Sequence, residues 1–218
     1  MNGSLNIYPY LCIEGNIGSG KTTLANLLAM DLDATLLLEQ FSDNPFLPEF
    51  YKDKTRYAFP VEVFFLAERH KQMESSLMLP DLFKPQIVSD YCFYKTALFA
   101  SQNLNEKEFG LFHRLYSQLE KSILEPGMIV YLDRPVESLL QNIQKRNRDF
   151  EAMISAEYLI TIQHAYRSYL ESIQHLPVLI LRLGSLNFST DSNVYNVICE
   201  NIDRYKSAPG THHVNLVS

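Results

Sequence analysis

The stretch CIEGNIGSGKTTLANLL, residues 12–28, decides the fold. Its centre, GNIGSGKT (15–22), matches the pattern G-x-x-x-x-G-K-[ST] in full, with an apolar run before it and a helical pattern after it. Glycines at these positions let backbone N–H groups curl around a phosphate. The stretch therefore predicts a nucleotide-binding loop, whose phosphate-cradling residues are Gly15, Asn16, Ile17, Gly18, Ser19, Gly20, Lys21, Thr22 and Thr23.

Outside this loop, short apolar runs alternate with helical patterns, which is typical of parallel βαβ units. The predicted strands are 8–14, 35–38, 86–89, 128–132 and 178–183, and the predicted helices are 21–30, 59–77, 93–103, 106–124, 136–146, 156–174 and 193–205. Ser155 is the expected N-cap of the helix at 156, and Pro60 is expected at an element edge. We predict an α/β fold of the P-loop NTPase type, with three α/β/α layers, a five-stranded parallel sheet and a helical lid.

The length, the net charge and the cysteine spacing limit the classes of protein and of binding partner. The 218 residues suit one domain, expected over 1–206 with the lid at about 142–154, and the polar tail 207–218 is expected to be disordered. A net charge of −6 argues against a nucleic-acid partner, and no apolar run approaches the roughly 20 residues that a membrane span needs. The three cysteines lack metal-ligand spacing, so they are interpreted as reduced packing residues of a cytoplasmic protein.

Charged residues elsewhere favour phosphoryl transfer to a small molecule. Lys21 is expected to reach the β- and γ-phosphates, while Thr22 and an acid at a strand end, Asp90 or Asp133, place Mg²⁺; Asp90 is preferred. The segment LQNIQKRNRDFE (140–151) carries Arg146 and Arg148, which suit a lid that stabilises the migrating phosphoryl group. Taken alone, the same segment is also typical of a solvated basic helix end. No N-K-x-D motif of a GTPase and no long insertion of a motor is present.

Longer stretches carry a resemblance to the deoxynucleoside kinase family. They are IEGNIGSGKTTL (13–24), LLLEQFSDNPFLPEFYKD (36–53), FPVEVFFLAERHKQ (59–72), VYLDRPVESLLQNIQKRNRDFE (130–151) and ISAEYLITIQHAY (154–166). They stand in the family's order with similar spacing, and the chain resembles the family from about residue 10 to residue 205. The resemblance implies a nucleotide-salvage kinase that uses ATP and Mg²⁺ to phosphorylate the 5′-hydroxyl of a deoxynucleoside. It also implies a homodimer, for which the helices at 64–79 and 109–124 are candidate faces.

Carried over position by position, the resemblance implies roles for four further residues. Glu39 would take the proton from the 5′-hydroxyl, Tyr51 and Glu151 would contact the 3′-hydroxyl, and Arg69 would lie at the base pocket. A carboxylate beside a phosphate loop suits general-base transfer from a hydroxyl. Judged without the resemblance, Glu39 is equally typical of a surface acid at a strand end, and Tyr51 of a core tyrosine.

One departure from the family concerns the base. Glu62 stands where the family usually has Gln, and an ionised carboxylate only accepts hydrogen bonds. Two acceptors match the adjacent N–H and NH₂ donors of guanine, which favours a guanine-type purine. The alternative is that Glu62 pairs with Arg69 or faces solvent.

A second departure lies in VSDYCFYKTALFA (88–100). The family usually has an acid–Arg–Ser triplet here, and this stretch contains no arginine. Alignment from Asp90 puts Tyr91 at the arginine position, whereas alignment back from LFA puts Asp90 there and Lys95 near a base-facing acid. Both alignments stay open, and Lys95 is a candidate substitute for the missing cation.

A smaller departure is Asn147, which replaces a lid glycine; asparagine tolerates the left-handed backbone that a turn requires.

The leading hypothesis is therefore a Mg²⁺-dependent deoxynucleoside 5′-kinase with ATP as donor and a purine preference. One alternative is a related P-loop kinase with a changed acceptor, prompted by Glu62 and the missing arginine. The other is a nucleotide-binding module with little catalysis, against which the retention of Glu39 and both lid arginines argues.

Overall fold

The phosphate-loop stretch folds into a strand, a loop and a helix, as predicted. In the computed structural model, which describes residues 10–40, 44–78, 84 and 86–216, β1 (Tyr10–Gly15) ends at the first glycine and α1 (Lys21–Asp31) begins at the lysine. Gly18 between them has a φ of +82°, a conformation that residues with a Cβ rarely adopt. A Cβ there would lie 2.7 Å from the backbone oxygen of Leu139 in α6 (Val136–Arg146), so the loop meets this helix closely only with glycine.

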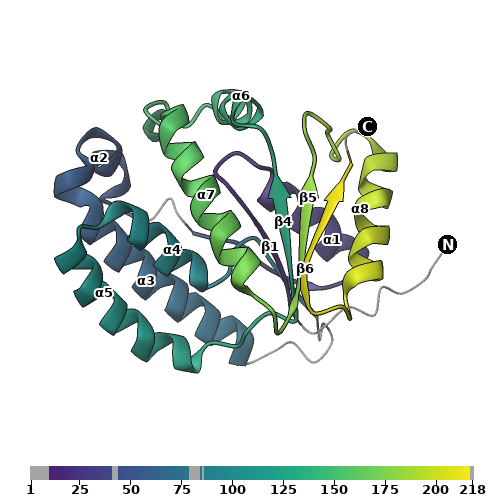
Figure 1. Ribbon diagram of the computed structural model, residues 1–218, viewed down its shortest axis with the longest axis horizontal. Helices are drawn as coiled ribbons and strands as arrows, with labels where there is room; N and C mark the ends of the chain where they lie inside the picture. The colour runs from purple at the N-terminus through teal and green to yellow at the C-terminus, as the bar shows by residue number, and fades with distance from the viewer. Residues whose placement is uncertain (1–9, 41–43, 79–83, 85, 217–218) are drawn as a thin grey trace.

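Parallel strands form the middle layer of three (Figure 1). β2 (Thr35–Leu37), β3 (Ile87–Ser89), β4 (Met128–Asp133), β5 (Pro177–Arg182) and β6 (Gly210–Asn215) join β1 in the order β2-β3-β1-β4-β5-β6. Every pairing is parallel, and Cys12 lies opposite Ser89 on one side and Ile129 on the other. The α/β prediction is confirmed, but the sheet has six strands where five were expected.

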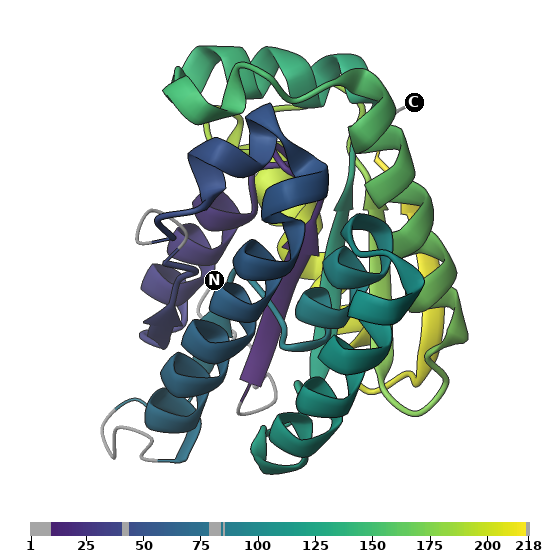
Figure 2. The same ribbon diagram turned by 90° about the vertical axis from the view of Figure 1, so that its left-hand side faces the viewer.

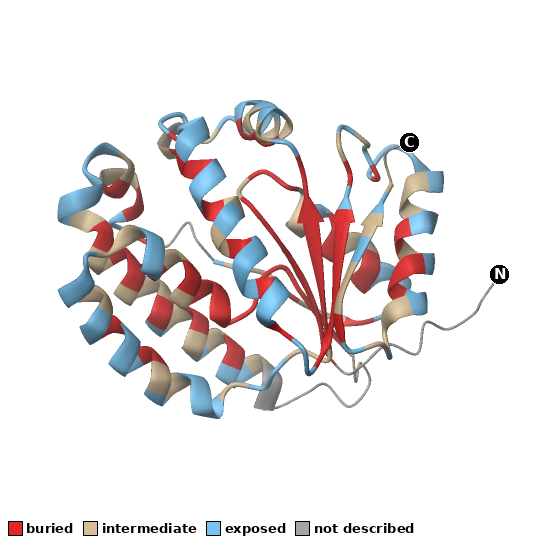
Figure 3. Cartoon of the chain, viewed as in Figure 1, coloured by how far each residue is buried: buried red, intermediate tan, exposed pale blue. Residues whose placement is uncertain are grey.

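Helices cover both faces of the sheet (Figures 1 and 2). One layer holds α3 (Lys54–Met78), α4 (Tyr94–Asn103), α5 (Glu106–Leu119) and α7 (Ala156–Ser172), and the other holds α1 and α8 (Ser192–Tyr205). Buried apolar side chains form a separate cluster on each face, and the helices alternate between buried and exposed positions while the central strands are buried (Figure 3). In the part of the chain that the structure describes, no helix has the length and apolar character to cross a membrane.

Two expectations about local structure are wrong, and one helix was not predicted. Pro60 lies inside α3 instead of at its edge, because the helix starts at Lys54 and tolerates the one missing N–H donor within 25 residues. The helix α2 (Leu47–Lys52) was not predicted, since six residues with a proline near the start give no helical period. Residues 210–215 form β6 along β5 and are not a disordered tail. The first two residues of the strand expected at 8–14 lie outside the described residues.

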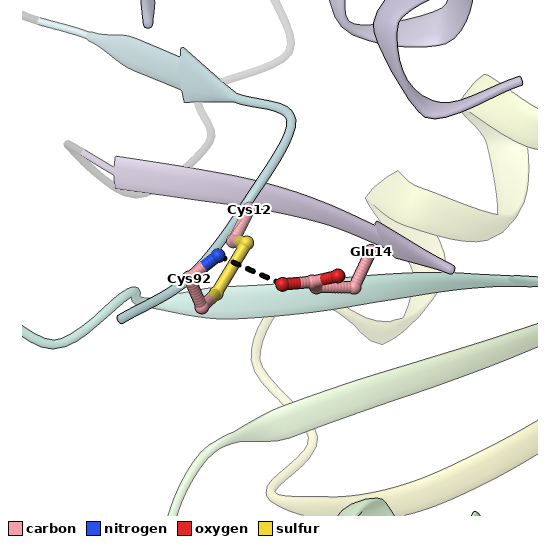
Figure 4. Close-up of side chains that lie close together, drawn as sticks. All are labelled: Cys12, Glu14 and Cys92. Carbon is pink, nitrogen blue, oxygen red and sulfur yellow. Dashed lines mark hydrogen bonds between the residues drawn. A yellow bond between two sulfur atoms is a disulfide. The ribbon is translucent and has the colours of Figure 1, made fainter. Parts of the chain in front are cut away.

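Two of the three cysteines also differ from expectation. Cys12 in β1 and Cys92 after β3 form a disulfide, with Cα atoms 6.2 Å apart (Figure 4). The pairing of β1 with β3 brings the two segments together. The Cys92 N–H donates to Oε1 of the buried Glu14 (2.8 Å), so the disulfide lies beside a carboxylate of the phosphate-loop strand. The interpretation of all three cysteines as reduced is therefore wrong for this pair, whereas Cys199 is a free thiol.

Candidate active site

Two adjoining pockets open at the carboxyl ends of the strands, where open α/β sheets bind ligands. The inner pocket contains every residue predicted to be catalytic, substrate-binding or metal-binding: Lys21, Thr22, Glu39, Tyr51, Glu62, Arg69, Asp90, Arg146, Arg148 and Glu151. The outer pocket runs along residues 18–23 of the loop and is completed by Arg134 and residues 185–189. Four side chains line both pockets, namely Lys21, Thr22, Arg146 and Arg148. Charged groups therefore concentrate where the two pockets meet.

The phosphate loop is fastened from several sides. Asn16 lies beneath the loop, where its Nδ2 donates to the backbone oxygen of Leu159 in α7 (2.8 Å), and Asn142 Nδ2 donates to the Gly18 oxygen (2.8 Å). Arg134 Nε donates to the Ser19 oxygen (2.9 Å). Gly15 and Asn16 thus shape the loop, whereas Ile17 faces the inner pocket and residues 18–23 the outer one.

Lys21 has an unusual environment for an amine. Its Nζ donates to the Asn16 oxygen (2.9 Å). Burial, together with the charge of Lys95, lowers the pKa of Lys21 to about 8, although Glu14, Glu39 and Asp90 act in the opposite direction. An anionic phosphate would restore the full charge of this amine, because an opposite charge favours the protonated form.

Thr22 and Asp90 form a pair of hard oxygen ligands. The Thr22 hydroxyl donates to Oδ2 of Asp90 (2.5 Å), and Oδ1 of Asp90 accepts from the Glu39 N–H (2.8 Å). Mg²⁺ prefers such oxygens and keeps several waters, so this donor set fits the ion. The other candidate acid, Asp133, bonds Gln163 and Arg167 and does not line the inner pocket. The geometry therefore favours Asp90 for this role.

Glu39 is held between two buried cations. Arg69 Nε donates to its Oε1 (2.9 Å), and Lys95 Nζ donates to its Oε2 (2.5 Å). Burial raises the pKa of Glu39, but the charges of Lys95 and Arg69 outweigh this and hold the pKa well below its usual range. Glu39 is therefore ionised at neutral pH, and its orientation is fixed by both partners.

Lys95, the candidate substitute for the missing arginine, lies in the site. Lys95 is 6% exposed and lines the inner pocket. Tyr91 is fully buried elsewhere, where its hydroxyl donates to Oε1 of Gln72 (2.6 Å). A cation thus lies beside Glu39 although the arginine is absent from the sequence at the expected position.

The lid arginines share one carboxylate. Arg146 donates to both oxygens of Glu151 (2.5 and 2.6 Å), and Arg148 approaches Oε1 at 3.4 Å. Asn147 between them has a φ of +49°, so asparagine does adopt the left-handed turn that its position requires. Tyr51 stacks against Phe150 of the lid, with ring centroids 6.5 Å apart. The residues predicted to hold a sugar therefore lie together under the lid.

Glu62 does not pair with Arg69. Its Oε1 accepts from Asn103 Nδ2 (2.6 Å), its Oε2 is buried without a hydrogen-bond partner, and Arg69 instead donates to Thr96 and Glu39. Burial raises the pKa of Glu62 to about 7, against the lowering effect of Asn103 and Arg69. Both alternatives for Glu62, an ion pair with Arg69 and a solvent-facing side chain, are excluded by this arrangement.

Several side chains of the site were not predicted, among them Asn103, Thr96 and Arg134. Asn103 is the last residue of α4 and Thr96 lies in its first turn, positions without any motif. Arg134 lies two residues after the strand predicted at 128–132, within a quoted motif, and that placement at a carboxyl end is a signal that could have identified it. Its guanidinium also lies 5.7 Å from the ring of Phe188 in the outer pocket.

Comparisons with known proteins agree with the predicted family resemblance and with the fold. The sequence model of a family described as deoxynucleoside kinase matches residues 11–206. A deoxyguanosine kinase of Bacillus subtilis (strain 168) is 33% identical over 173 residues, which cover 78% of this chain and 82% of the relative. A deoxyadenosine kinase of Dictyostelium discoideum is 32% identical over 176 residues, with 78% and 70% covered. A solved structure of deoxyadenosine kinase from M. mycoides with bound dCTP has a TM-score of 0.72 at 18% identity, covers 89% of this chain and 99% of that one, and shows the shared fold.

Proposed function

Since this chain belongs to the deoxynucleoside kinase family, we propose that it transfers the γ-phosphoryl group of ATP to the 5′-hydroxyl of a purine deoxynucleoside, with guanine-type bases preferred. The family phosphorylates deoxynucleosides, so the chain is a phosphotransferase that acts on an alcohol group. The observation that carries the proposal is the pair of pockets that share Lys21, Thr22, Arg146 and Arg148. A donor in the outer pocket and an acceptor in the inner pocket would meet at those four side chains.

In the proposed reaction the 5′-oxygen forms a bond to the γ-phosphorus while the bond to the β,γ-bridging oxygen breaks, and ADP leaves. The hydroxyl proton passes to Glu39, which the substrate reaches through lone pairs not used by Arg69 and Lys95. Because the transition state of phosphoryl transfer is loose, a weakly basic carboxylate suffices, and its main task is to orient the hydroxyl.

Positive charge at the pocket junction stabilises the transferring group. Lys21 and the lid residues Arg146 and Arg148 face the γ-phosphate position, and Lys95 takes the place of the missing arginine next to Glu39. Thr22 and Asp90 would hold Mg²⁺. When bound, the ion neutralises charge on the β- and γ-phosphates.

The sugar and base assignments complete the proposal. Tyr51 and Glu151 contact the 3′-hydroxyl, Glu62 reads the base, and Arg69 acts chiefly by holding Glu39. The preference for a guanine-type base rests on the acceptor oxygens of Glu62. The relative named deoxyguanosine kinase supports this, and the one named deoxyadenosine kinase makes adenine the competing base.

The remaining proposals concern the whole protein. We propose that the chain from β1 to β6 forms one kinase domain, which extends past the expected end at 206 and has its lid at about 142–154, and that it acts in the cytoplasm as a homodimer. Exposed Leu111 and Leu115, one turn apart on α5, support an interface there. Light scattering of the native chain and of a Leu111→Glu, Leu115→Glu variant tests the dimer, which the two charges should dissociate.

The reaction is tested with a panel of deoxynucleosides, ATP and Mg²⁺, beside a Glu39→Gln variant. Phosphorylation of a purine deoxynucleoside, lost in Glu39→Gln, is the expected result. Glu68→Gln on α3, which lies outside both pockets, is the matched control and should retain activity. Turnover of a different alcohol would indicate a changed acceptor, and ATP binding without any turnover would indicate a nucleotide-binding module.

A further inference from the structure

Among the residues that the structure describes, the inner pocket contains one buried carboxyl oxygen without a hydrogen-bond partner. Glu62 on α3 is 2% exposed, and its Oε2 makes no hydrogen bond, whereas its Oε1 is occupied by Asn103. A buried polar atom left unpaired costs about 1–3 kcal/mol, so such an atom facing a pocket indicates a ligand that completes it. Aromatic side chains surround the same space, namely Phe65, Phe99, Phe150 and Tyr158. Their flat surfaces favour a planar ring as the partner of Oε2.

We propose that the protonation state of Glu62 sets which class of purine the enzyme accepts, an inference that rests on the proposed kinase function. Ionised Glu62 accepts a hydrogen bond at Oε2 and therefore pairs with the N1–H of a 6-oxopurine. Protonated Glu62 donates from Oε2 and therefore pairs with the bare N1 of a 6-aminopurine. The wrong pairing in each case sets two acceptors or two donors against each other.

Asn103 makes this exchange directional. Its Nδ2 donates to Oε1 in the 2.6 Å hydrogen bond, so Oε1 remains the acceptor in both forms of the carboxyl group. The proton of the neutral form is consequently carried by Oε2, the oxygen that is free to meet a base. An ordinary glutamine at this position would present a donor and an acceptor at every pH.

The charges around Glu62 allow both forms near neutrality. Arg69 of the same helix and Lys95 of α4 favour the ionised form, while Glu39 after β2 disfavours it. Tyr51 of α2 and Tyr158 of α7 face the same carboxyl group and remain neutral at these pH values, since burial raises the pKa of each phenol. Both cations face Glu39 as well, so their influence on Glu62 is partly offset. Burial raises the pKa of Glu62 to about 7.

The test compares kcat/KM for deoxyguanosine and deoxyadenosine between pH 6 and 8, where neither base changes protonation. Effects of pH on the shared phosphoryl-transfer groups cancel in the ratio of the two values, which reports the free enzyme. The ratio of kcat/KM for deoxyguanosine to kcat/KM for deoxyadenosine should rise about tenfold per pH unit, because the ratio of ionised to protonated Glu62 rises by that factor. In Glu62→Gln the ratio should be independent of pH, and in Glu74→Gln, an exposed position on the same helix, it should rise as in the native protein.

Equilibrium binding of the same two nucleosides at pH 6 and 8, measured by calorimetry, separates this inference from the proposed reaction. If neither nucleoside is phosphorylated but the affinity ratio shifts with pH in the native protein and not in Glu62→Gln, the kinase proposal fails and the role of Glu62 stands. A ratio that stays within twofold, an equal slope in Glu62→Gln, or no binding of either nucleoside overturns the inference.

Discussion

Replacing Lys95 by methionine tests whether a lysine has taken over the work of the missing arginine. Methionine keeps most of the buried stem and removes the amine that donates to Oε2 of Glu39. In the proposed reaction the lost group is a preorganised charge beside the 5′-hydroxyl, and removal of one such donor typically costs about 2.7–4 kcal/mol in the transition state. We therefore expect kcat/KM to fall about 10²–10³-fold.

Nucleotide affinity should respond differently. Lys95 and Lys21 repel each other, and this repulsion contributes to the lowered pKa of Lys21. Without Lys95 the Lys21 amine holds its proton more firmly, so ATP should bind at least as tightly as before. Steady-state kinetics and equilibrium ATP binding at pH 7 measure the two effects separately. Lys107→Met, at an exposed position on α5, is the control for loss of a positive charge.

Two results would refute this reasoning. One is a Lys95→Met variant whose kcat/KM stays within threefold of the native value. The other is a large loss in Tyr91→Phe, because the Tyr91 hydroxyl bonds Gln72 outside the inner pocket and should matter only for stability, by about 1 kcal/mol.

Three further predictions concern the loop and the disulfide. ATP affinity of the native protein should fall as the pH rises from 7 to 9, because only the protonated Lys21 attracts phosphate and its pKa is about 8; a fluorescent ATP analogue measures this, and a flat profile would contradict it. Gly18→Ala should lower stability by about 1–3 kcal/mol and weaken ATP binding, whereas Gly110→Ala, which has no atom within 4 Å of the new Cβ, should do neither; thermal melts with and without ATP decide. Reduction of the Cys12–Cys92 disulfide should cost about 2–4 kcal/mol in urea unfolding, since the bond closes a loop of 80 residues, and three titratable thiols in the untreated protein would disprove the bond.

The phosphate loop and its flanking elements were predictable from local sequence. The backbone of such a loop requires glycine at set positions, and the loop always connects a strand to a helix. Gly20 of the motif shows this, since its φ is +98° and a Cβ there would lie 3.1 Å from the ring of Phe188. The lid was predicted from Arg146 and Arg148 and supported by the resemblance, and Asn147 could be interpreted because asparagine tolerates the turn.

Features that depend on distant partners were not predictable. β6 is stabilised by its pairing with β5 and by contacts such as those of Thr211 with Leu170 and of His212 with Tyr205, whereas its own sequence, GTHHVN, has little strand character. Likewise, the partner of Glu62 is Asn103, 41 positions away, and no local pattern announces that contact. That Lys95 lies beside Glu39 while Tyr91 is buried outside the inner pocket required the geometry, because the sequence left both alignments open.

The carboxylate that the two lid arginines share has a consequence for the hydrolysis of ATP by water. Arg146 and Arg148 both rest on Glu151, the residue proposed to grip the sugar. While no sugar is present, that carboxylate neutralises the arginines. They would then not stabilise the attack of a water molecule on the γ-phosphate. A nucleoside that claims Glu151 would release both guanidinium groups at the moment an acceptor is in place. The lid would thus suppress hydrolysis of ATP by water when no nucleoside is bound.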